Sequence, residues 1–397
     1  MLGLSANSDS LLRKLMRPDI ATMEEYTPIV PFEVLSRRLG LPSSQIVKLD
    51  ANENPYGPAP AVYDALAACQ RYNIYPDPEQ TLLREAIEPY LGLSRQHVIF
   101  GNGSDELIDL TMRLFVTPGD VVVNLPPTFG MYSYNTSLCA GKLISVSRRG
   151  DFSVDAEAVT KTVELAGDRA RMLIVNSPNN PDGSVIEPAL LRRLLDLPVI
   201  VVLDEAYAEF SGTSFISWVR EHWNLIVLRT FSKWAALGGL RIGYGIYPLE
   251  IAGQLWKIKP PYSINVAAQE AALASLQSTD YLMHNVSLLV AERERLFQRL
   301  RTVAALTPYP SRSNFILCRV RGVPLRLLKE ALASRGILVR YYDKPGLSDC
   351  FRVSIGRPEQ NDAFFAALVD MLPWLTPSEP DRGKAAVRFS AKGDDKQ

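Results

Sequence analysis

One segment of the sequence brings a lysine together with hydroxyl side chains, glycines and an arginine. It reads Thr-Phe-Ser-Lys-Trp-Ala-Ala-Leu-Gly-Gly-Leu-Arg over residues 230–241 and follows an apolar run at 225–229. A lysine at a strand end can attack an aldehyde once its ammonium loses a proton, which burial and a neighbouring cation favour. Arg241 can supply that cation and can also bind a phosphate. Taken alone, Lys233 could equally be a surface lysine in a loop.

A second motif places a carboxylate at the end of a hydrophobic run. Asp204 follows Val-Val-Leu at 201–203, and a carboxylate there is costly to bury unless it meets a cation or hydrogen-bond donors. A protonated pyridine nitrogen is such a partner, and Tyr207 could present its phenol to an oxygen on the same ring. The alternative is an aspartate that caps the next helix. The presence of the lysine motif favours the first interpretation.

Three further segments follow apolar runs and suit a flat, anionic ligand. In Asn-Ser-Pro-Asn-Asn-Pro-Asp-Gly at 176–183, Asn180 can hydrogen-bond a ring substituent from a rigid turn. In Gly-Asn-Gly-Ser-Asp-Glu at 101–106, a helix N-terminus can bind an anion. In Pro-Pro-Thr-Phe-Gly at 126–130, Phe129 can stack on a ring. The alternatives are an ordinary turn, a helix capping box and a buried loop aromatic. The glycine-rich segment lacks the third glycine of a dinucleotide site.

These segments need a scaffold that places several strand ends side by side. Seven apolar runs predict strands, at 98–100, 121–125, 143–146, 172–175, 199–203, 225–229 and 242–246. Several runs lack polar alternation, which is typical of strands covered on both faces and favours a parallel-rich sheet. Helical patterns at 105–115 and 187–195 lie between them. We therefore predict an α/β sandwich in which strands lead into helices.

The sequence after residue 260 has a different pattern. A long helical pattern at 267–301 precedes alternating strands and helices at 314–320, 325–334, 338–341, 351–355 and 361–372. We predict a smaller α+β domain there, which residues 26–71 join because an extended N-terminal segment cannot build a core alone. The prediction divides the chain into an N-terminal arm at 1–25, a large domain at 72–260, a small domain at 26–71 plus 261–376, and a flexible tail at 377–397.

Length and composition exclude several classes of protein. The 397 residues suffice for two or three domains. The 43 basic and 43 acidic residues give no net charge, so we expect neither nucleic acid nor a membrane surface as a partner. Apolar runs are too short to span a bilayer. Four scattered cysteines predict a reduced, cytoplasmic chain without disulfides. Three widely separated histidines argue against a metal site.

Taken together, the motifs resemble the pyridoxal-phosphate enzymes of fold type I, the aspartate-aminotransferase fold, and more narrowly the histidinol-phosphate aminotransferase family. Further segments that carry the resemblance are Asp-Ala-Asn-Glu-Asn-Pro-Tyr-Gly-Pro at 50–58, Tyr-Pro-Asp-Pro at 75–78, Lys-Pro-Pro-Tyr at 259–262 and Arg-Val-Ser-Ile-Gly at 352–356. They run in family order from about residue 26 to 372. The resemblance implies a large domain with a seven-stranded, mostly parallel sheet beside the smaller α+β domain.

The resemblance also assigns roles around the cofactor, pyridoxal 5′-phosphate. It implies that Lys233 forms the internal aldimine and then carries the proton, while Asp204 pairs with the pyridinium nitrogen and strengthens the ring as an electron sink. Asn180 and Tyr207 would contact the ring oxygen, and Phe129 would stack on the ring. The residues implied around the cofactor phosphate are Gly103, Ser104, Asp105, Thr230, Ser232 and Arg241.

Further residues are implied in substrate binding and assembly. Tyr75 matches a tyrosine that reaches the cofactor phosphate of the neighbouring subunit, which implies a homodimer. Arg352 matches the arginine that holds the substrate α-carboxylate in a bidentate pair. Arg340 and Tyr26 match positions that meet the far end of the substrate, including its phosphate. Asn54 completes the expected substrate-binding set.

The reaction that the resemblance implies is a ping-pong transamination in histidine biosynthesis. It converts L-histidinol phosphate and 2-oxoglutarate into imidazole-acetol phosphate and L-glutamate. Three alternatives remain at this point: a broad or aromatic amino acid aminotransferase, a decarboxylase of a phosphorylated amino acid that uses the same cofactor, and a non-catalytic homologue that binds an effector. The sequence departs from the family at Trp234, where a small residue is common, and at Phe129, where tyrosine is frequent. Trp234 could change the shape of the pocket.

Overall fold

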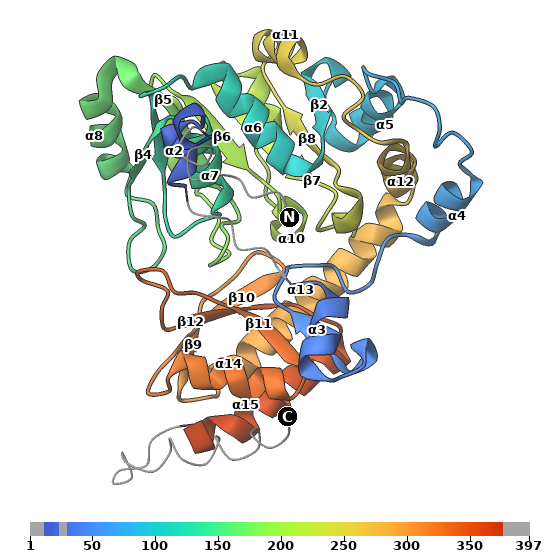
Figure 1. Ribbon diagram of the computed structural model, residues 1–397, viewed down its shortest axis with the longest axis vertical. Helices are drawn as coiled ribbons and strands as arrows, with labels where there is room; N and C mark the ends of the chain where they lie inside the picture. The colour runs from blue at the N-terminus through green and yellow to red at the C-terminus, as the bar shows by residue number, and fades with distance from the viewer. Residues whose placement is uncertain (1–11, 24–29, 376–397) are drawn as a thin grey trace. The chain divides into compact units, whose positions relative to one another are not determined.

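The computed structural model describes residues 12–23 and 30–375, which form two compact units (Figure 1). The larger unit contains Glu53–Val290 and Ser311–Asn314, together with residues 12–23. The smaller unit contains residues 30–52, 291–310 and 315–375. Tyr26, most of the expected N-terminal arm and the expected tail lie outside the described residues. Compactness alone does not define a domain that folds independently, so the domain boundaries expected from the sequence stay a prediction.

The larger unit contains a seven-stranded sheet, as the sequence predicts. The strand order is β2-β8-β7-β6-β5-β3-β4. The strands are β2 (Val98–Gly101), β3 (Val121–Asn124), β4 (Lys142–Ser145), β5 (Ala170–Asn176), β6 (Ile200–Asp204), β7 (Leu225–Thr230) and β8 (Gly243–Ile246). Every residue of β2, β3, β6, β7 and β8 is buried, which explains why these strands lack polar alternation in the sequence.

Most pairings in this sheet are parallel. β4, β3, β5, β6 and β7 form a parallel series, whereas β8 is antiparallel to both β7 and β2. The carboxyl ends of β5, β6 and β7 therefore meet at one edge of the sheet. Loops that follow parallel strands at such an edge are the usual place for ligands in an open α/β sheet.

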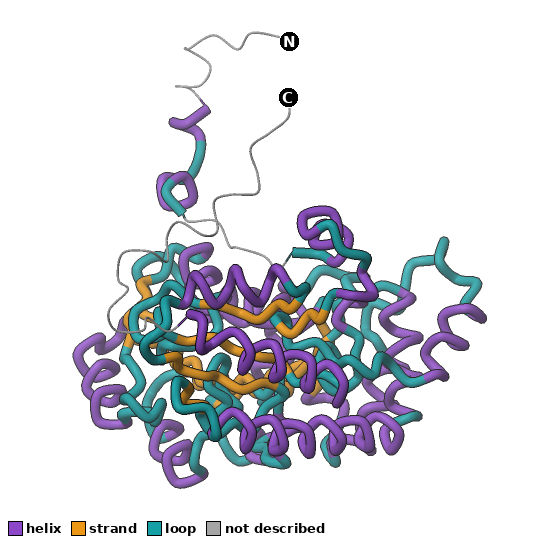
Figure 2. Tube along the Cα trace, turned by 90° about the horizontal axis from the view of Figure 1, so that it is seen from below, coloured by secondary structure: helices purple, strands orange, loops and turns teal. Residues whose placement is uncertain are grey.

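Helices separate most of the strands along the chain (Figure 2). Those of the larger unit are α2 (Pro18–Ala21), α4 (Pro60–Ala68), α5 (Thr81–Leu91), α6 (Gly103–Phe115), α7 (Met131–Leu138), α8 (Ala156–Ala166), α9 (Pro188–Leu195), α10 (Ala208–Ser211), α11 (Leu249–Ile258) and α12 (Val266–Gln277). α6 packs against β2, β7 and β8 (Figure 1), with Leu107, Ile108 and Met112 in the core. Their helical spacing predicts this buried face.

The long helix that the sequence predicts at 267–301 is two helices. α12 ends at Gln277, and α13 begins at Thr279 and continues to Arg301. Ser278 separates them with φ −109° and ψ 26°, which is outside the helical region. The break was not predicted because both helices continue the same apolar pattern across one residue.

The smaller unit has a five-stranded sheet of order β1-β11-β12-β10-β9. Its elements are α3 (Phe32–Leu39), β1 (Val47–Leu49), β9 (Leu306–Pro308), β10 (Phe315–Val320), α14 (Leu325–Ser334), β11 (Ile337–Tyr341), β12 (Cys350–Ser354) and α15 (Pro358–Leu375). β1 is parallel to β11, and the other pairs are antiparallel. The sequence did not predict β1 and β9, because three residues are too few to show a period. The α+β arrangement is confirmed.

Two negative findings apply to the part of the chain that the structure describes. None of its helices is both long enough and apolar enough to cross a membrane. No group of three or more His, Cys, Asp or Glu side chains within it could hold a metal ion.

Candidate active site

Asp204 is the buried carboxylate at the end of β6. It is 3% exposed, and its oxygens accept hydrogen bonds from the Tyr132 hydroxyl at 2.7 Å and from the Ala206 backbone N–H at 3.0 Å. Burial raises the pKa of Asp204 to about 6, and the two hydrogen bonds oppose that rise. The carboxylate does not cap a helix from this position; instead it is held in place inside the protein.

Lys233 lies beyond the end of the neighbouring strand. β6 and β7 are parallel, with Asp204 opposite Leu228, so the segment after β7 starts beside the Asp204 end of β6. The Lys233 side chain is half-buried, and its Nζ atom lies 5.8 Å from the centroid of the Tyr207 ring. Tyr207 is 5% exposed and precedes α10. The structure therefore brings together the lysine and the Asp204–Tyr207 motif that the sequence placed on separate strands.

The N-terminus of α6 forms an anion-binding end of the site. α6 begins at Gly103, and Asn102 at its N-cap makes no side-chain capping hydrogen bond. The Arg241 guanidinium lies against this turn, because a Cβ atom added at Gly103 would be 2.7 Å from Arg241 Nη2. The same Nη2 contacts Asp105 Oδ2 at 3.0 Å. Helix N–H groups and a guanidinium at one place favour a phosphate.

Two hydroxyls lie beside this helix end. Thr230 ends β7, and its Oγ1 accepts a hydrogen bond from the Ser232 N–H at 3.0 Å and lies 2.9 Å from Ser232 Oγ. Thr230 is opposite Gly243 of β8. A Cβ atom added at Gly243 would be 2.7 Å from the Ser104 backbone nitrogen and 2.8 Å from the Arg229 oxygen. The absence of a side chain at Gly243 thus allows β7, β8 and the first turn of α6 to meet.

The two turns that carry Asn180 and Phe129 are joined by Asn179. The Asn179 side chain, which is fully buried, accepts a hydrogen bond from Thr128 Oγ1 at 2.8 Å and donates one to the Pro127 oxygen at 3.0 Å. Asn180 is half-buried, and its N–H donates to Asn176 Oδ1 at 2.8 Å. Phe129 is half-buried against the core cluster. No role for Asn179 was predicted from the sequence, and the structure shows that its side chain joins both turns.

Trp234 follows Lys233 directly in the chain and packs against another aromatic side chain, and its effect on the shape of the pocket stays a prediction. It is fully buried and stacks on Tyr90 at 5.3 Å with an interplanar angle of 11°. Its main-chain oxygen accepts a hydrogen bond from Asn54 Nδ2 at 3.2 Å, while Asn54 Oδ1 accepts one from the Tyr56 N–H at 3.0 Å. Asn54, expected to bind substrate, therefore uses its amide to hold the chain directly after Lys233.

Arg229, Glu205 and Glu209 form a buried ion network next to Asp204 in the chain, which was not predicted from the sequence. Arg229 of β7 donates to Glu205 Oε2 from Nε at 3.0 Å and from Nη2 at 2.8 Å, and to Glu209 Oε1 at 3.0 Å. The side chains of Arg229, Glu205 and Glu209 are 7%, 1% and 3% exposed. Since Glu205 and Arg229 adjoin Asp204 and Thr230 in the chain, this network joins β6 and β7 at the site.

The remaining predicted residues belong to other segments of the chain. Tyr75 is 82% exposed in the larger unit, with its ring centroid 5.0 Å from that of Tyr262. Arg340 and Arg352 belong to the smaller unit, where they stand directly opposite each other on the antiparallel strands β11 and β12. Arg352 Nη2 donates to the Asp50 oxygen at 2.8 Å. Like charges in opposite positions are unfavourable without an anion, so this pair suits an anionic group.

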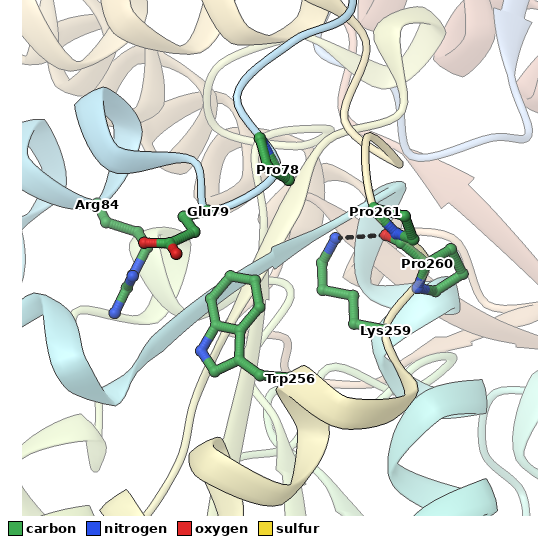
Figure 3. A pocket seen from close by; sticks show the side chains of 7 residues that line it. All are labelled: Pro78, Glu79, Arg84, Trp256, Lys259, Pro260 and Pro261. Atoms are coloured by element: carbon green, nitrogen blue, oxygen red, sulfur yellow. Dashed lines mark hydrogen bonds between the residues drawn. The ribbon is translucent and has the colours of Figure 1, made fainter.

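A cavity of about 430 Å³ in the larger unit is separate from the Lys233 motif (Figure 3). Its lining includes Arg84, Trp256 and Lys259. Arg84 donates twice to the Arg95 oxygen, at 3.0 and 3.1 Å, and Lys259 donates to Ser263 Oγ. Burial lowers the pKa of Lys259. None of the residues that line this cavity belongs to the Lys233 motif or to the first turn of α6.

Comparisons with known proteins show the family of the chain. Residues 44–368 match the family "Aminotransferase class I and II". The chain is 51% identical to a histidinol-phosphate aminotransferase of Roseiflexus castenholzii, covering 90% of this chain and 98% of that protein. It is 49% identical to a chloroplastic histidinol-phosphate aminotransferase of Nicotiana tabacum, covering 89% and 86%.

A solved structure gives the same result. The crystal structure of histidinol-phosphate aminotransferase from Sinorhizobium meliloti in complex with pyridoxal-5′-phosphate matches with a TM-score of 0.83 and 29% identity, covering 91% of this chain and 98% of that one. The family match spans more than half of the chain, and the relatives are similar over nearly their whole length. The chain belongs to the class I and II aminotransferases and, within them, to the histidinol-phosphate aminotransferase family.

Proposed function

We propose that this protein is a pyridoxal-phosphate-dependent transaminase that transfers the amino group of L-histidinol phosphate to 2-oxoglutarate. The observation that carries the proposal is the buried Asp204 carboxylate at the end of β6, next to the strand that leads to Lys233. The relatives that support the substrate are named histidinol-phosphate aminotransferases. Histidine biosynthesis is the corresponding pathway.

The residues present fit the cofactor at both of its ends. The α6 N-terminus, Arg241 and the Thr230 and Ser232 hydroxyls offer donors for the phosphate. The space left by Gly243 admits no Cβ atom and keeps these donors close together. At the other end, a buried carboxylate suits a protonated ring nitrogen, which returns part of the cost of burial. When bound, pyridoxal 5′-phosphate supplies an aldehyde and a ring that withdraws electrons.

The protein's own groups then orient the reactants and move a proton. The Lys233 amine would hold the cofactor through its aldehyde, and the free amine would carry the substrate α-proton on Nζ. Asp204 would face the ring nitrogen and keep it protonated. Asn180 and Tyr207 would contact the ring oxygen, and Phe129 would stack on the ring. The two half-reactions give ping-pong kinetics, because one site accepts the donor and the acceptor in turn.

Substrate anions are assigned to the smaller unit. We assign Arg352 to the carboxylate of glutamate and of 2-oxoglutarate, because its guanidinium can form a bidentate pair. Arg340, directly opposite it, would meet the far end of the substrate together with Tyr26, which lies outside the described residues. Asn54 would lie near the substrate, because its side-chain amide holds the main chain directly after Lys233.

A homodimer is part of the proposal. Tyr75 is 82% exposed, and Tyr72, Ile74 and Tyr262 are 59%, 57% and 46% exposed. Large side chains exposed beside Tyr75 in the sequence, with the Tyr262 ring next to the Tyr75 ring, are typical of an interface. In the dimer, Tyr75 would reach the cofactor phosphate of the second subunit. We also propose a cytoplasmic location, which the four free cysteine thiols support.

Absorbance spectroscopy and a substrate panel test this function. The Lys233→Ala variant should lose the absorbance band of the lysine-bound cofactor, whereas Lys257→Ala, which changes an exposed lysine on α11, should keep it. The unaltered protein should form glutamate from L-histidinol phosphate and 2-oxoglutarate, faster than with phenylalanine as donor. An unchanged spectrum and full activity in Lys233→Ala would contradict the assignment. Preference for phenylalanine would indicate an aromatic aminotransferase, and release of carbon dioxide would indicate a decarboxylase.

A further inference from the structure

The hydrogen bond between Tyr132 and Asp204 joins two groups far apart in the chain. Tyr132 lies in the first turn of α7 and is fully buried. Its hydroxyl is 2.7 Å from Asp204 Oδ2. An ionised carboxylate only accepts hydrogen bonds, so the phenol is the donor. The ring itself packs edge-on against Phe129 at 5.6 Å; Tyr132 belongs to the hydrophobic core cluster, and Phe129 packs against that cluster.

The Tyr132 hydroxyl lowers the pKa of Asp204, whereas the surroundings of Asp204 raise it. Burial raises the pKa of the carboxyl group, and Asp105 of α6 and the adjacent Glu205 raise it further. The opposing contacts are the Tyr132 hydroxyl and the Ala206 N–H. Of these two, only the Tyr132 hydroxyl belongs to a side chain that substitution can remove.

The other charged groups nearby are already engaged. Glu205 is paired with Arg229 of β7. Arg148, which interacts with Tyr132 electrostatically, donates to the Leu125 and Phe152 oxygens at 3.2 and 3.0 Å. On the β5 side, Asn176 Nδ2 donates to the main-chain oxygen of Asp204 at 2.9 Å and leaves the carboxylate unaffected.

We propose that Tyr132 is a positioning residue that keeps the Asp204 carboxylate ionised and aimed, so that it can hold the protonated ring nitrogen at neutral pH. This inference deepens the proposed function and rests on it. Without the hydroxyl, the carboxylate loses one of its two donors inside a low-dielectric environment. A hydrogen bond to a charged group corresponds to a shift of about 1 to 2 pH units. The Asp204 pKa would then move into the neutral range.

The Tyr132→Phe variant tests this role, because phenylalanine preserves the ring and removes only the hydroxyl. The measurement is the equilibrium dissociation constant of added pyridoxal 5′-phosphate between about pH 5.5 and 8.5. Affinity should decline as the pH is lowered, and the midpoint of this decline marks the protonation of Asp204. In Tyr132→Phe we expect that midpoint to lie about 1 pH unit or more higher than in the unaltered protein. The matched control is Tyr247→Phe, which removes another fully buried hydroxyl from the same cluster. It should leave that midpoint where it is.

A second measurement does not depend on cofactor binding. The stability of the cofactor-free full chain toward urea should fall as pH rises toward the Asp204 pKa, since the folded state retains the proton longer than the unfolded state. In Tyr132→Phe this fall should continue to higher pH, so the difference from the unaltered protein grows above about pH 6. A constant difference at every pH would show that Tyr132 is merely structural and would overturn the inference.

The Asp204→Asn variant separates the two levels of the argument. If Asp204→Asn binds pyridoxal 5′-phosphate with unchanged affinity and pH dependence, the proposed pairing with the ring nitrogen is wrong. If Asp204→Asn alters that profile while Tyr132→Phe leaves its midpoint unmoved, the proposed function stands and the role of Tyr132 is refuted. The role of Tyr132 is supported if the midpoint is displaced in Tyr132→Phe and is unchanged in Tyr247→Phe.

Discussion

Replacing Arg241 with glutamine should weaken the binding of the cofactor phosphate and leave the fold intact. The guanidinium lies against the first turn of α6 and contacts Asp105 at 3.0 Å. Its side chain is 48% exposed and that of Asp105 is 40% exposed. An ion pair this exposed contributes about 1 kcal/mol or less to folding, so the stability of Arg241→Gln should change little.

The loss of affinity can be estimated from the contact that a phosphate would make. A hydrogen bond between charged partners contributes about 1.5 to 3 kcal/mol, and about 1.4 kcal/mol corresponds to a factor of ten in the dissociation constant. Because half of the guanidinium is in solvent, we expect the lower end of this range, about tenfold. Raising the ionic strength should reduce the difference between the two proteins.

The assay compares pyridoxal 5′-phosphate with pyridoxal, which lacks the phosphate. Arg241→Gln should bind pyridoxal 5′-phosphate about tenfold more weakly than the unaltered protein does, and its affinity for pyridoxal should be unchanged. Arg113→Ala is the control, because Arg113 also forms an exposed ion pair on α6, with Asp109, but lies in the last turn of the helix. An equal loss of affinity for both ligands would refute the argument that Arg241 binds the phosphate.

Two further variants test the interior of the site. Burial raises the Asp204 pKa from about 3.9 in an unfolded chain to about 6. The cofactor-free protein should therefore lose about 2 to 3 kcal/mol of stability from this group as the pH rises through that interval, and Asp204→Asn should lack this slope in urea titrations. Arg229→Ala should reduce the free energy of unfolding by about 3 to 5 kcal/mol, because it leaves Glu205 and Glu209 buried without their cation. A loss below about 1 kcal/mol would show that solvent reaches those carboxylates.

Much of the fold and site is readable from the sequence because the chemistry lies directly after buried strands. An apolar run directly precedes Asp204, another at 225–228 lies shortly before Lys233, and both lie in the parallel sheet as predicted. Parallel strands align their carboxyl ends, so residues that follow neighbouring strands come together without further information. The Gly103 turn was also recognisable, since a glycine next to a helix start has few other uses.

Contacts made by tertiary packing could not be predicted in the same way. Tyr132 reaches Asp204 across 72 positions of sequence, and nothing in its neighbourhood distinguishes it from a core aromatic. Arg340 and Arg352 lie opposite each other because of the register between β11 and β12, and the hydrogen bonds between these strands set that register. The stacking of Trp234 on Tyr90 also depends on tertiary packing, which the position of Trp234 beside Lys233 does not indicate.

Gly243 limits how this protein can be redesigned. Backbone atoms of two different segments, the first turn of α6 and β7, surround the space where its side chain would be, and backbone cannot move aside as a flexible side chain can. Even alanine would separate the first turn of α6 from the sheet. Attempts to adapt the enzyme to a modified cofactor should therefore vary Ser232 and Arg241, whose side chains can be exchanged without disturbing that frame, and leave this glycine as it is.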